Sequence, residues 1–191
     1  MHELIETDIE KCIEVLHSGG LILYPTDTIW GIGCDATNQQ AIDKIFKLKN
    51  REDSKAMIIF VKDKNKIDKY ANQPSKEIFS YLNSAVNPTT VIYRGAKNLP
   101  SNLIGKDLTI GIRIPDDHFC QDLLQNFGKP IVSTSANISG ESSPLFFSHI
   151  SEIIKNGVDY VVQHRRNEII EKKPSSIISM NEDGSIKIIR P

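Results

Sequence analysis

The sequence contains few cysteines, and their spacing does not suit a metal site or a disulfide framework. There are three, Cys12, Cys34 and Cys120, with no CxxC pair. An odd number of widely separated cysteines is typical of reduced thiols, so we expect a reducing compartment and no structural zinc. The five histidines are also scattered, and no pair has the spacing of metal ligands on one helix. The sequence therefore predicts no protein-bound metal.

Long apolar runs are missing too. No segment approaches the roughly eighteen apolar residues of a membrane span. Residues 1–6 lack the charged start and apolar run of a signal peptide. We therefore expect a cytoplasmic protein that does not contact a membrane.

Neither sign of charge is in excess. The 191 residues include 23 Lys and Arg and 24 Asp and Glu, which gives a formal net charge of -1. This balance argues against a general double-stranded RNA-binding module but leaves room for a local basic patch. With 39% hydrophobic residues, the length suits one domain over residues 1–191 that buries a sizeable core.

Three common active-site motifs are absent as well. The sequence has no GxGxxG and no GxxxxGKS or GxxxxGKT, so neither a Rossmann fingerprint nor a P-loop explains nucleotide binding. GxSxG is also missing, which removes the usual nucleophile turn of a serine hydrolase.

What the sequence does contain is an alternation of apolar strands and amphipathic helices, which predicts an α/β protein. The first helix is expected to begin at a capping box of Thr7 and Glu10 and to end at Gly19 and Gly20. A loop is expected over 26–33. The other expected helices begin near Thr37 or cover 64–71, 75–86, 116–127 and 147–155, and the strands cover 21–24, 57–61, 89–93, 108–114, 131–134, 160–162, 175–179 and 185–189. Because the last third is richer in strands than a βαβ repeat, we expect a twisted mixed β-sheet with helices packed against it.

Three polar clusters lie beside predicted strands, where α/β proteins place their ligands. The first is Pro25–Thr28 with Gly31 and Gly33. Its hydroxyls suit a small polar ligand, and glycine allows a close backbone approach. The same residues also form ordinary turns, in which Asp27 and Thr28 satisfy local backbone groups. The sequence alone leaves both interpretations open.

The second cluster is cationic and lies at the end of a predicted helix. It comprises Lys47, Lys49, Arg51 and Lys55. Cations at a helix C-terminus are favoured by about 0.3–1 kcal/mol each, which is one explanation. The other is a triphosphate clamp, because arginine offers a planar fork for phosphate oxygens and lysine a mobile charge.

The third cluster, Ser133–Gly140, ends a predicted strand with four hydroxyls and an amide. A loop of small hydroxylated residues can wrap a phosphate or a ribose with side chains and backbone N–H groups. A self-satisfied Ser/Thr turn is the simpler alternative. No histidine is placed to make Ser133 or Ser135 an obvious nucleophile.

Taken in order, these clusters resemble the motifs of the YrdC-like family, the threonylcarbamoyl-adenylate synthases. The similarity runs from Gly19 to Pro191. The matching segments are Gly19–Gly20, Pro25–Gly31, Lys49–Arg51, Thr109–Pro115, Thr134–Gly140, Pro174–Ser176 and Ile189–Pro191. The resemblance implies that the mixed sheet carries an open ligand cavity, and that the chain is similar to the short single-domain form of the family.

The resemblance also implies roles for matching residues. Threonine would be bound by Thr26, Arg113, Ser133 and Ser175. ATP would be bound by Lys49, Arg51, Lys55, Thr109, Ser135, Asn137, Ser143 and Arg190. Of these, Arg113 would pair with the threonine carboxylate, and Lys49 and Arg51 would act in catalysis. The chain departs from the family at Glu52 and Ala56, where prolines are common.

The implied reaction converts L-threonine, bicarbonate and ATP to threonylcarbamoyl-AMP and pyrophosphate, for the threonylcarbamoyladenosine modification of tRNA. Mg²⁺ would be carried by the nucleotide. The sequence offers no strong general base, so we expect catalysis by positioning and by charge stabilisation at phosphorus. The product would pass to proteins that modify tRNA, and contact with tRNA itself fits the same role.

Two related functions are alternatives. One is a YrdC-like paralogue that binds nucleotide or RNA without making the adenylate. The other is a carbamoyl-transfer domain like those of hydrogenase maturation proteins, which belong to much longer chains. Retention of Thr26, Arg51, Arg113 and Ser135 favours the synthase.

Overall fold

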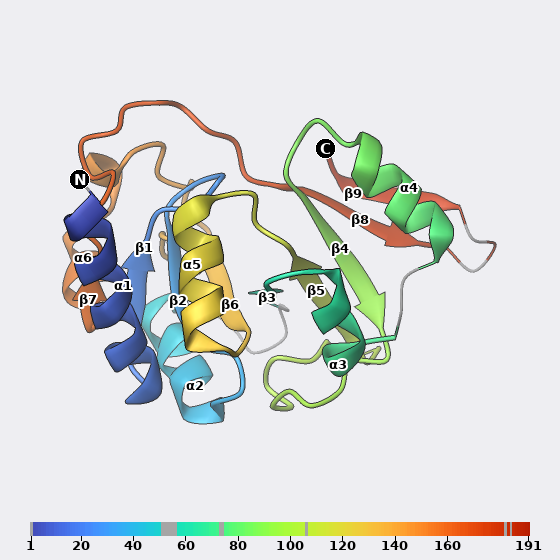
Figure 1. Cartoon of the computed structure of the whole chain (residues 1–191), viewed down its shortest axis with the longest axis horizontal. Coiled ribbons are helices and arrows are strands. Elements are labelled where there is room, and N and C mark those ends of the chain that lie inside the picture. The colour runs from blue at the N-terminus through green and yellow to red at the C-terminus, as the bar shows by residue number, and fades with distance from the viewer. Residues whose placement is uncertain (1, 51–56, 73–74, 106, 182, 184) are drawn as a thin grey trace.

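The computed structural model describes residues 2–50, 57–72, 75–105, 107–181, 183 and 185–191. Within these ranges, nine strands form one mixed sheet in the order β7-β1-β2-β6-β3-β5-β4-β8-β9 (Figure 1). The strands are β1 (Ile22–Tyr24), β2 (Gly31–Asp35), β3 (Ile58–Phe60), β4 (Thr89–Arg94), β5 (Thr109–Arg113), β6 (Ile131–Ser135), β7 (Tyr160–Val161), β8 (Ser176–Met180) and β9 (Ile186–Arg190). The predicted α/β fold with a twisted mixed sheet is confirmed.

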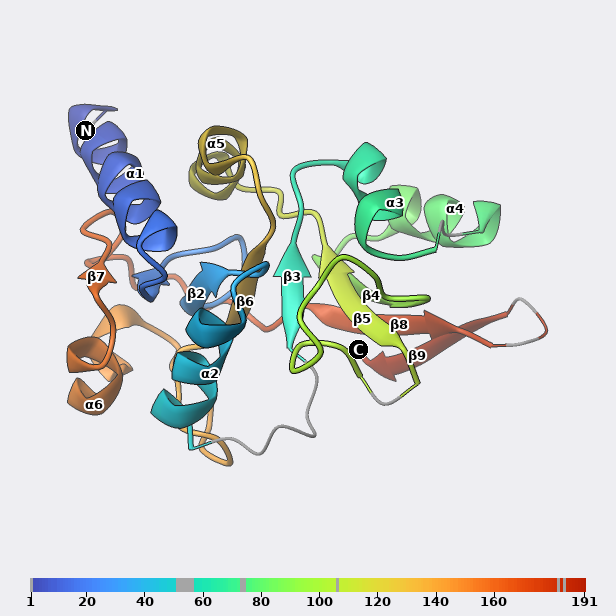
Figure 2. The same cartoon turned by 90° about the horizontal axis from the view of Figure 1, so that it is seen from below.

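Helices pack on both sides of the strands. The helical elements are α1 (His2–His17), α2 (Gln39–Leu48), η1 (Lys64–Lys66), α3 (Ile67–Tyr70), α4 (Lys76–Ser84), α5 (His118–Phe127), η2 (Phe147–His149) and α6 (Glu152–Asn156). Figure 2 shows α1, α5, α3 and α4 on one side of the molecule and α2 and α6 on the other. Fully buried side chains such as Leu16, Ile42 and Leu123 anchor these helices, each contributing about 1.5–3 kcal/mol. No helix that the structure describes is both long and apolar enough to span a bilayer.

The strand order brings distant segments together. β6 lies between β2 and β3 and pairs antiparallel with both, so Ser133 has Gly33 on one side and Ile58 on the other. β5 runs parallel to β3, with Arg113 beside Phe60. The site described below is built on this register.

The start of the first helix differs from the prediction. Thr7 lies inside α1, and its Oγ1 donates a hydrogen bond to the carbonyl of Glu3 at 2.9 Å. The hydroxyl therefore bonds back to the preceding turn, a common alternative to capping, and the predicted capping box is wrong. The predicted end is confirmed, because α1 ends at His17 and Gly19 has a φ of 72°, which glycine adopts without strain.

The predicted loop over 26–33 is wrong in its second half. Residues Gly31–Asp35 form β2, and all of them are buried between β1 and β6. The next helix also begins later than predicted, because its N-cap is Asn38, whose Oδ1 accepts from Ala41 N at 3.2 Å. Thr37 instead bonds to Asp35 through its N–H and its hydroxyl. The remaining predicted elements are confirmed to within about two residues at each end, except the helix predicted over 147–155. That prediction is wrong, because the segment forms the short η2 and then α6, with extended backbone at Ile150 and Ser151 and the Ser151 hydroxyl as the N-cap of α6.

Candidate active site

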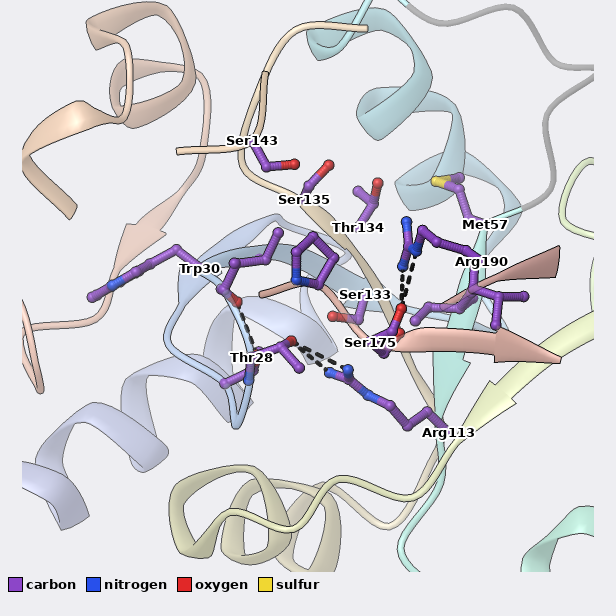
Figure 3. Close-up of a pocket in the computed structure, with 16 residues that line it drawn as sticks. Thr28, Trp30, Met57, Arg113, Ser133, Thr134, Ser135, Ser143, Ser175 and Arg190 are labelled. Atoms are coloured by element: carbon purple, nitrogen blue, oxygen red, sulfur yellow. Dashed lines mark hydrogen bonds between the residues drawn. The ribbon is translucent and has the colours of Figure 1, made fainter. Parts of the chain in front are cut away.

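A cavity of about 210 Å³ opens where the loop before β2, the ends of β5 and β6, the start of β8 and the end of β9 converge (Figure 3). The lining residues lie far apart in the sequence, within 26–31, 57–58, 133–135 and 174–177 and at Arg113, Ser143 and Arg190. The lining residues predicted for threonine or ATP are Thr26, Arg113, Ser133, Ser135, Ser143, Ser175 and Arg190. The fold thus brings together all the side chains predicted to bind threonine and several of those predicted to bind ATP.

Arg113 is the buried cation of this cavity, with 4% of its surface exposed. Its Nη2 lies 3.0 Å from Asp27 Oδ1, and both terminal nitrogens donate to Thr28 Oγ1 at 3.2 Å. The guanidinium also stacks on Phe60, 4.5 Å from the ring centre. Burial lowers the pKa of Arg113 from its ordinary value, while the Asp27 carboxylate opposes that change, so the side chain stays charged.

The hydrogen bonds of Arg113 leave capacity for a ligand. Its Nε is buried and has no hydrogen-bond partner in the part of the chain that the structure describes. A buried guanidinium with one carboxylate and one hydroxyl partner can still accept a second anionic group, and its planar fork suits a carboxylate. Figure 3 shows this guanidinium pointing into the same space as Thr28 and Ser133.

The Thr26–Thr28 loop is fixed by its own hydroxyls and by a distant arginine. Thr26 Oγ1 accepts from Thr28 N at 3.0 Å and donates to the Ile29 carbonyl at 2.8 Å. Arg165 Nη2 donates to the Thr26 carbonyl at 3.0 Å, and its Nη1 lies 2.6 Å from Asp117 Oδ2. The turn interpretation of this cluster is therefore confirmed, and the same turn lines the cavity, whereas ligand binding by its hydroxyls stays a prediction.

Arg165 and Thr28 were not among the predicted site residues. Thr28 belongs to the first polar cluster, but the sequence did not predict that its hydroxyl accepts hydrogen bonds from Arg113. Arg165 gave no local signal, because its partner Thr26 lies 139 residues away in the sequence.

The opposite wall carries Ser175 and Arg190. Arg190 Nε and Nη2 donate to the Ser175 carbonyl at 3.0 and 2.7 Å, and the Ser175 and Thr90 hydroxyls lie 2.9 Å apart. Burial lowers the pKa of Arg190, and the positive charge of Arg113 adds to this. Two guanidinium groups thus face one cavity, which favours an anionic ligand.

Lys49 and Asn137 support the loop after β6 and do not line the cavity. Lys49 is 1% exposed, and its Nζ donates to the carbonyls of Ser135 and Asn137, the latter at 2.5 Å. The Lys49 carbonyl accepts from Ser139 N at 2.8 Å. Asn137 Nδ2 donates to two carbonyls of the same loop, those of Ile138 and Glu141. The ammonium therefore holds the backbone that presents Ser135.

Of the three other predicted ATP residues, the structure describes Thr109 alone. Thr109 begins β5, at the opposite end of that strand from Arg113, and does not line the cavity. Arg51 and Lys55 lie outside the described residues, as do Glu52 and Ala56, the departures from the family pattern. The described lining contains no carboxylate, so a metal ion at this cavity would depend on ligand oxygens and water, as suits Mg²⁺ bound to phosphates.

The three thiols are buried and unpaired in the structure. Burial raises the pKa of each above its ordinary value, and nearby carboxylates add to this at all three. Cys120 donates to the Pro25 carbonyl at 3.6 Å. All three thiols are therefore protonated and shielded, which does not suit a nucleophile.

The sequence and the fold identify the family to which this chain belongs. Residues 14–191 match the Sua5, YciO and YrdC family model, described as "Telomere recombination", and the chain is a member of that family. A protein of Methanocaldococcus jannaschii is 36% identical over 194 residues, which cover 98% of this chain and 89% of that protein. A threonylcarbamoyl-AMP synthase of Pseudoalteromonas translucida is 33% identical over 160 residues, covering 82% and 86%.

Solved structures show the same fold. Escherichia coli YciO superposes with a TM-score of 0.82 at 25% identity and covers 95% of this chain and 87% of its own. P. abyssi Sua5 complexed with L-threonine superposes with a TM-score of 0.83 at 23% identity. That match covers 96% of this chain and 53% of the Sua5 chain, so this chain spans about half of its length.

Proposed function

We propose that this protein is an L-threonylcarbamoyladenylate synthase, a nucleotidyltransferase that makes threonylcarbamoyl-AMP and pyrophosphate from L-threonine, bicarbonate and ATP. The observation that carries the proposal is the cavity in which a buried, incompletely bonded Arg113 faces the hydroxyls of Thr26, Ser133 and Ser175. Homologues named as threonylcarbamoyl-AMP synthases support an enzyme of this kind.

The positive charge of Arg113 indicates which end of the cavity would bind threonine. A free amino acid presents a carboxylate, and Arg113 offers two terminal N–H groups and Nε in one plane. Thr28 and Asp27 already bond to the guanidinium, so it is oriented before the ligand arrives. Pre-orientation lowers the entropy lost on binding. The L-threonine complex of P. abyssi Sua5 is compatible with this assignment.

The nucleotide end would lie along Ser135, Ser143 and Arg190, with Arg51, Lys55 and Thr109 as further predicted contacts. Lys49 and Asn137 would act there by fixing the loop after β6. In the proposed reaction, a carbamate oxygen of N-carboxylated threonine attacks the α-phosphorus of ATP, and pyrophosphate leaves. Lys49 and Arg51 would assist, the first through the loop and the second by offsetting developing charge on the phosphates. Mg²⁺ would enter with ATP as part of the substrate.

The product is a reactive mixed anhydride, so we propose that proteins of tRNA modification take it up directly, and that the chain contacts tRNA as part of that transfer. We propose a cytoplasmic location for the same reason, since the substrates and tRNA are found there.

One observation favours a second candidate. The chain is also 26% identical over 185 residues to Escherichia coli YciO, which is named only as an uncharacterized protein and not as a synthase. The alternative for this chain is a paralogue that binds nucleotide or RNA without making the adenylate. Such a protein would bind ATP and release no pyrophosphate in response to threonine.

The deciding experiment measures pyrophosphate release from ATP by the purified full chain with bicarbonate present. A synthase should release pyrophosphate only when L-threonine is added and should form threonylcarbamoyl-AMP in equal amount. Serine and valine serve as controls for side-chain recognition. Tight ATP binding without threonine-dependent release would rule out the synthase in favour of the paralogue.

A further inference from the structure

Tyr24, the last residue of β1, lies across two glycines of the neighbouring strand. It pairs with Gly31 in the sheet register. A methyl group on Gly33 would come within 2.8 Å of Tyr24 Cε1, and one on Gly31 within 3.6 Å. The ring therefore fills the space that two side chains would otherwise occupy. Phe60 packs edge-on against the ring, with centroids 6.4 Å apart and planes at 76°, so its position is fixed.

The Tyr24 ring lies beside Ser133, whose hydroxyl lines the cavity. A methyl group on Gly31 would also lie 3.1 Å from Ser133 Oγ, so the tyrosine ring and the serine hydroxyl share the space above one glycine. Burial raises the pKa of Tyr24 well above its ordinary value, and the nearby Cys120 thiol adds to this, whereas Ser133 and Arg113 act in the opposite direction. The phenol is thus a neutral O–H group close to both cavity residues.

The hydrogen bonding of the Tyr24 hydroxyl is not satisfied. Tyr24 is 1% exposed, and its oxygen makes no hydrogen bond of full geometry in the described part of the chain, although Ser133 is close enough to lower its pKa through a side-chain hydrogen bond. Buried hydroxyls are almost always paired, so an unpaired one calls for a partner that forms in another state of the site. Ser133 can supply it, because a serine hydroxyl accepts and donates at the same time.

We propose that Tyr24 is a positioning residue for Ser133. The Tyr24 O–H donates a hydrogen bond to Ser133 Oγ. The Ser133 O–H then points into the cavity and donates a hydrogen bond to an anionic oxygen of the bound substrate. Tyr24 does not line the cavity, so it acts through Ser133. Hydrogen bonds in a chain polarise one another, which makes Ser133 a stronger donor when it accepts from Tyr24. The inference rests on the proposed function, in which that oxygen belongs to threonine.

The test is Tyr24→Phe, which removes the hydroxyl and keeps the ring over the glycines. We expect the KM and the Kd for threonine to rise about three- to ten-fold, the loss of one neutral hydrogen bond. The KM for ATP should not change, and the melting temperature should not fall. The matched control is Tyr93→Phe, because Tyr93 is a buried tyrosine that lines a separate cavity between α4, β4 and β5; threonine affinity should be unchanged there.

A double-mutant cycle separates positioning from packing. In a Ser133→Ala background, Tyr24→Phe should weaken threonine binding no further, because the intermediary is gone. Additive effects, or wild-type threonine affinity in Tyr24→Phe alone, would overturn the inference and leave the proposed function standing. If the wild-type chain binds no threonine in calorimetry, the proposed function fails and this inference fails with it.

Discussion

Arg113 shows, at the scale of a residue, how one buried charge can serve both the fold and a ligand. Its side chain is 3% exposed and that of Asp27 7% exposed. Removing one member of a buried ion pair leaves the other uncompensated, which costs about 3–5 kcal/mol. Arg113→Ala would therefore lower both stability and threonine affinity, and the two effects could not be separated. Arg113→Lys is the better test because it keeps a cation opposite Asp27.

For Arg113→Lys we expect the KM for threonine to rise about ten- to a hundred-fold, since a charge-assisted contact is worth about 1.5–3 kcal/mol and lysine lacks the planar fork. The KM for ATP should change by no more than about three-fold. The rate of pyrophosphate release at varied threonine concentration gives the KM for threonine, and the rate at varied ATP concentration gives the KM for ATP. A normal threonine KM in this variant would remove Arg113 from the site.

Arg51 is the corresponding residue for the nucleotide. If it holds the triphosphate, Arg51→Ala should weaken ATP binding about ten- to a hundred-fold, again through loss of a charge-assisted contact. Threonine binding should change far less. Calorimetric titration with ATP measures this, and Lys64→Ala is the control because Lys64 is exposed in η1, outside the cationic cluster. Equal ATP affinity in the two variants would mean that the cationic cluster is a solvated helix end.

At the scale of elements, the site depends on Lys49, which joins the end of α2 to the loop after β6. Lys49→Met would keep the apolar stem and leave the carbonyls of Ser135 and Asn137 without the ammonium. We expect the free energy of unfolding to fall by about 2–4 kcal/mol, because buried acceptors lose a charged donor. Urea denaturation measures this.

The same variant should raise the KM for ATP, since Ser135 is displaced with its loop. Lys64→Met, at an exposed lysine in η1, is the control and should change stability by less than about 0.5 kcal/mol. A Lys49 variant that is stable but inactive would show that the ammonium acts on the substrate and not on the loop.

For the whole molecule, the three thiols report on the integrity of the core. Cys12, Cys34 and Cys120 lie on α1, β2 and α5, and all are buried with raised pKa values. A thiol reagent such as Ellman's reagent should therefore label the native protein at least about a hundred-fold more slowly than the protein in concentrated guanidinium chloride. Rapid labelling of the native chain at Cys34 would reveal an opening of the sheet beside the cavity.

How much of this could be predicted depended on the range of each interaction. Helix ends such as the left-handed Gly128 after α5 and the Ser75 cap of α4 are local, and both elements were predicted closely. Thr7 was misassigned because the same hydroxyl can cap a helix or bond back within one. Gly31 and Gly33 were assigned to a loop because glycine weakens a strand pattern, and only Tyr24 and β6 on either side make them a strand.

The sequence by itself determined most of the segments that become helices and strands, with β2 as an exception, because hydrophobic periodicity and capping act over a few residues. It also carried the family motifs in their order. The tertiary structure decided what those residues do together. Thr26 and Ser175 share one cavity although 148 intervening residues separate them, because β6 inserts between β2 and β3 and β8 returns to pair with β4. The tertiary structure also decided that the Lys49 ammonium donates to backbone carbonyls and does not line the cavity. A buried ammonium must bond to the acceptors that the fold places near it.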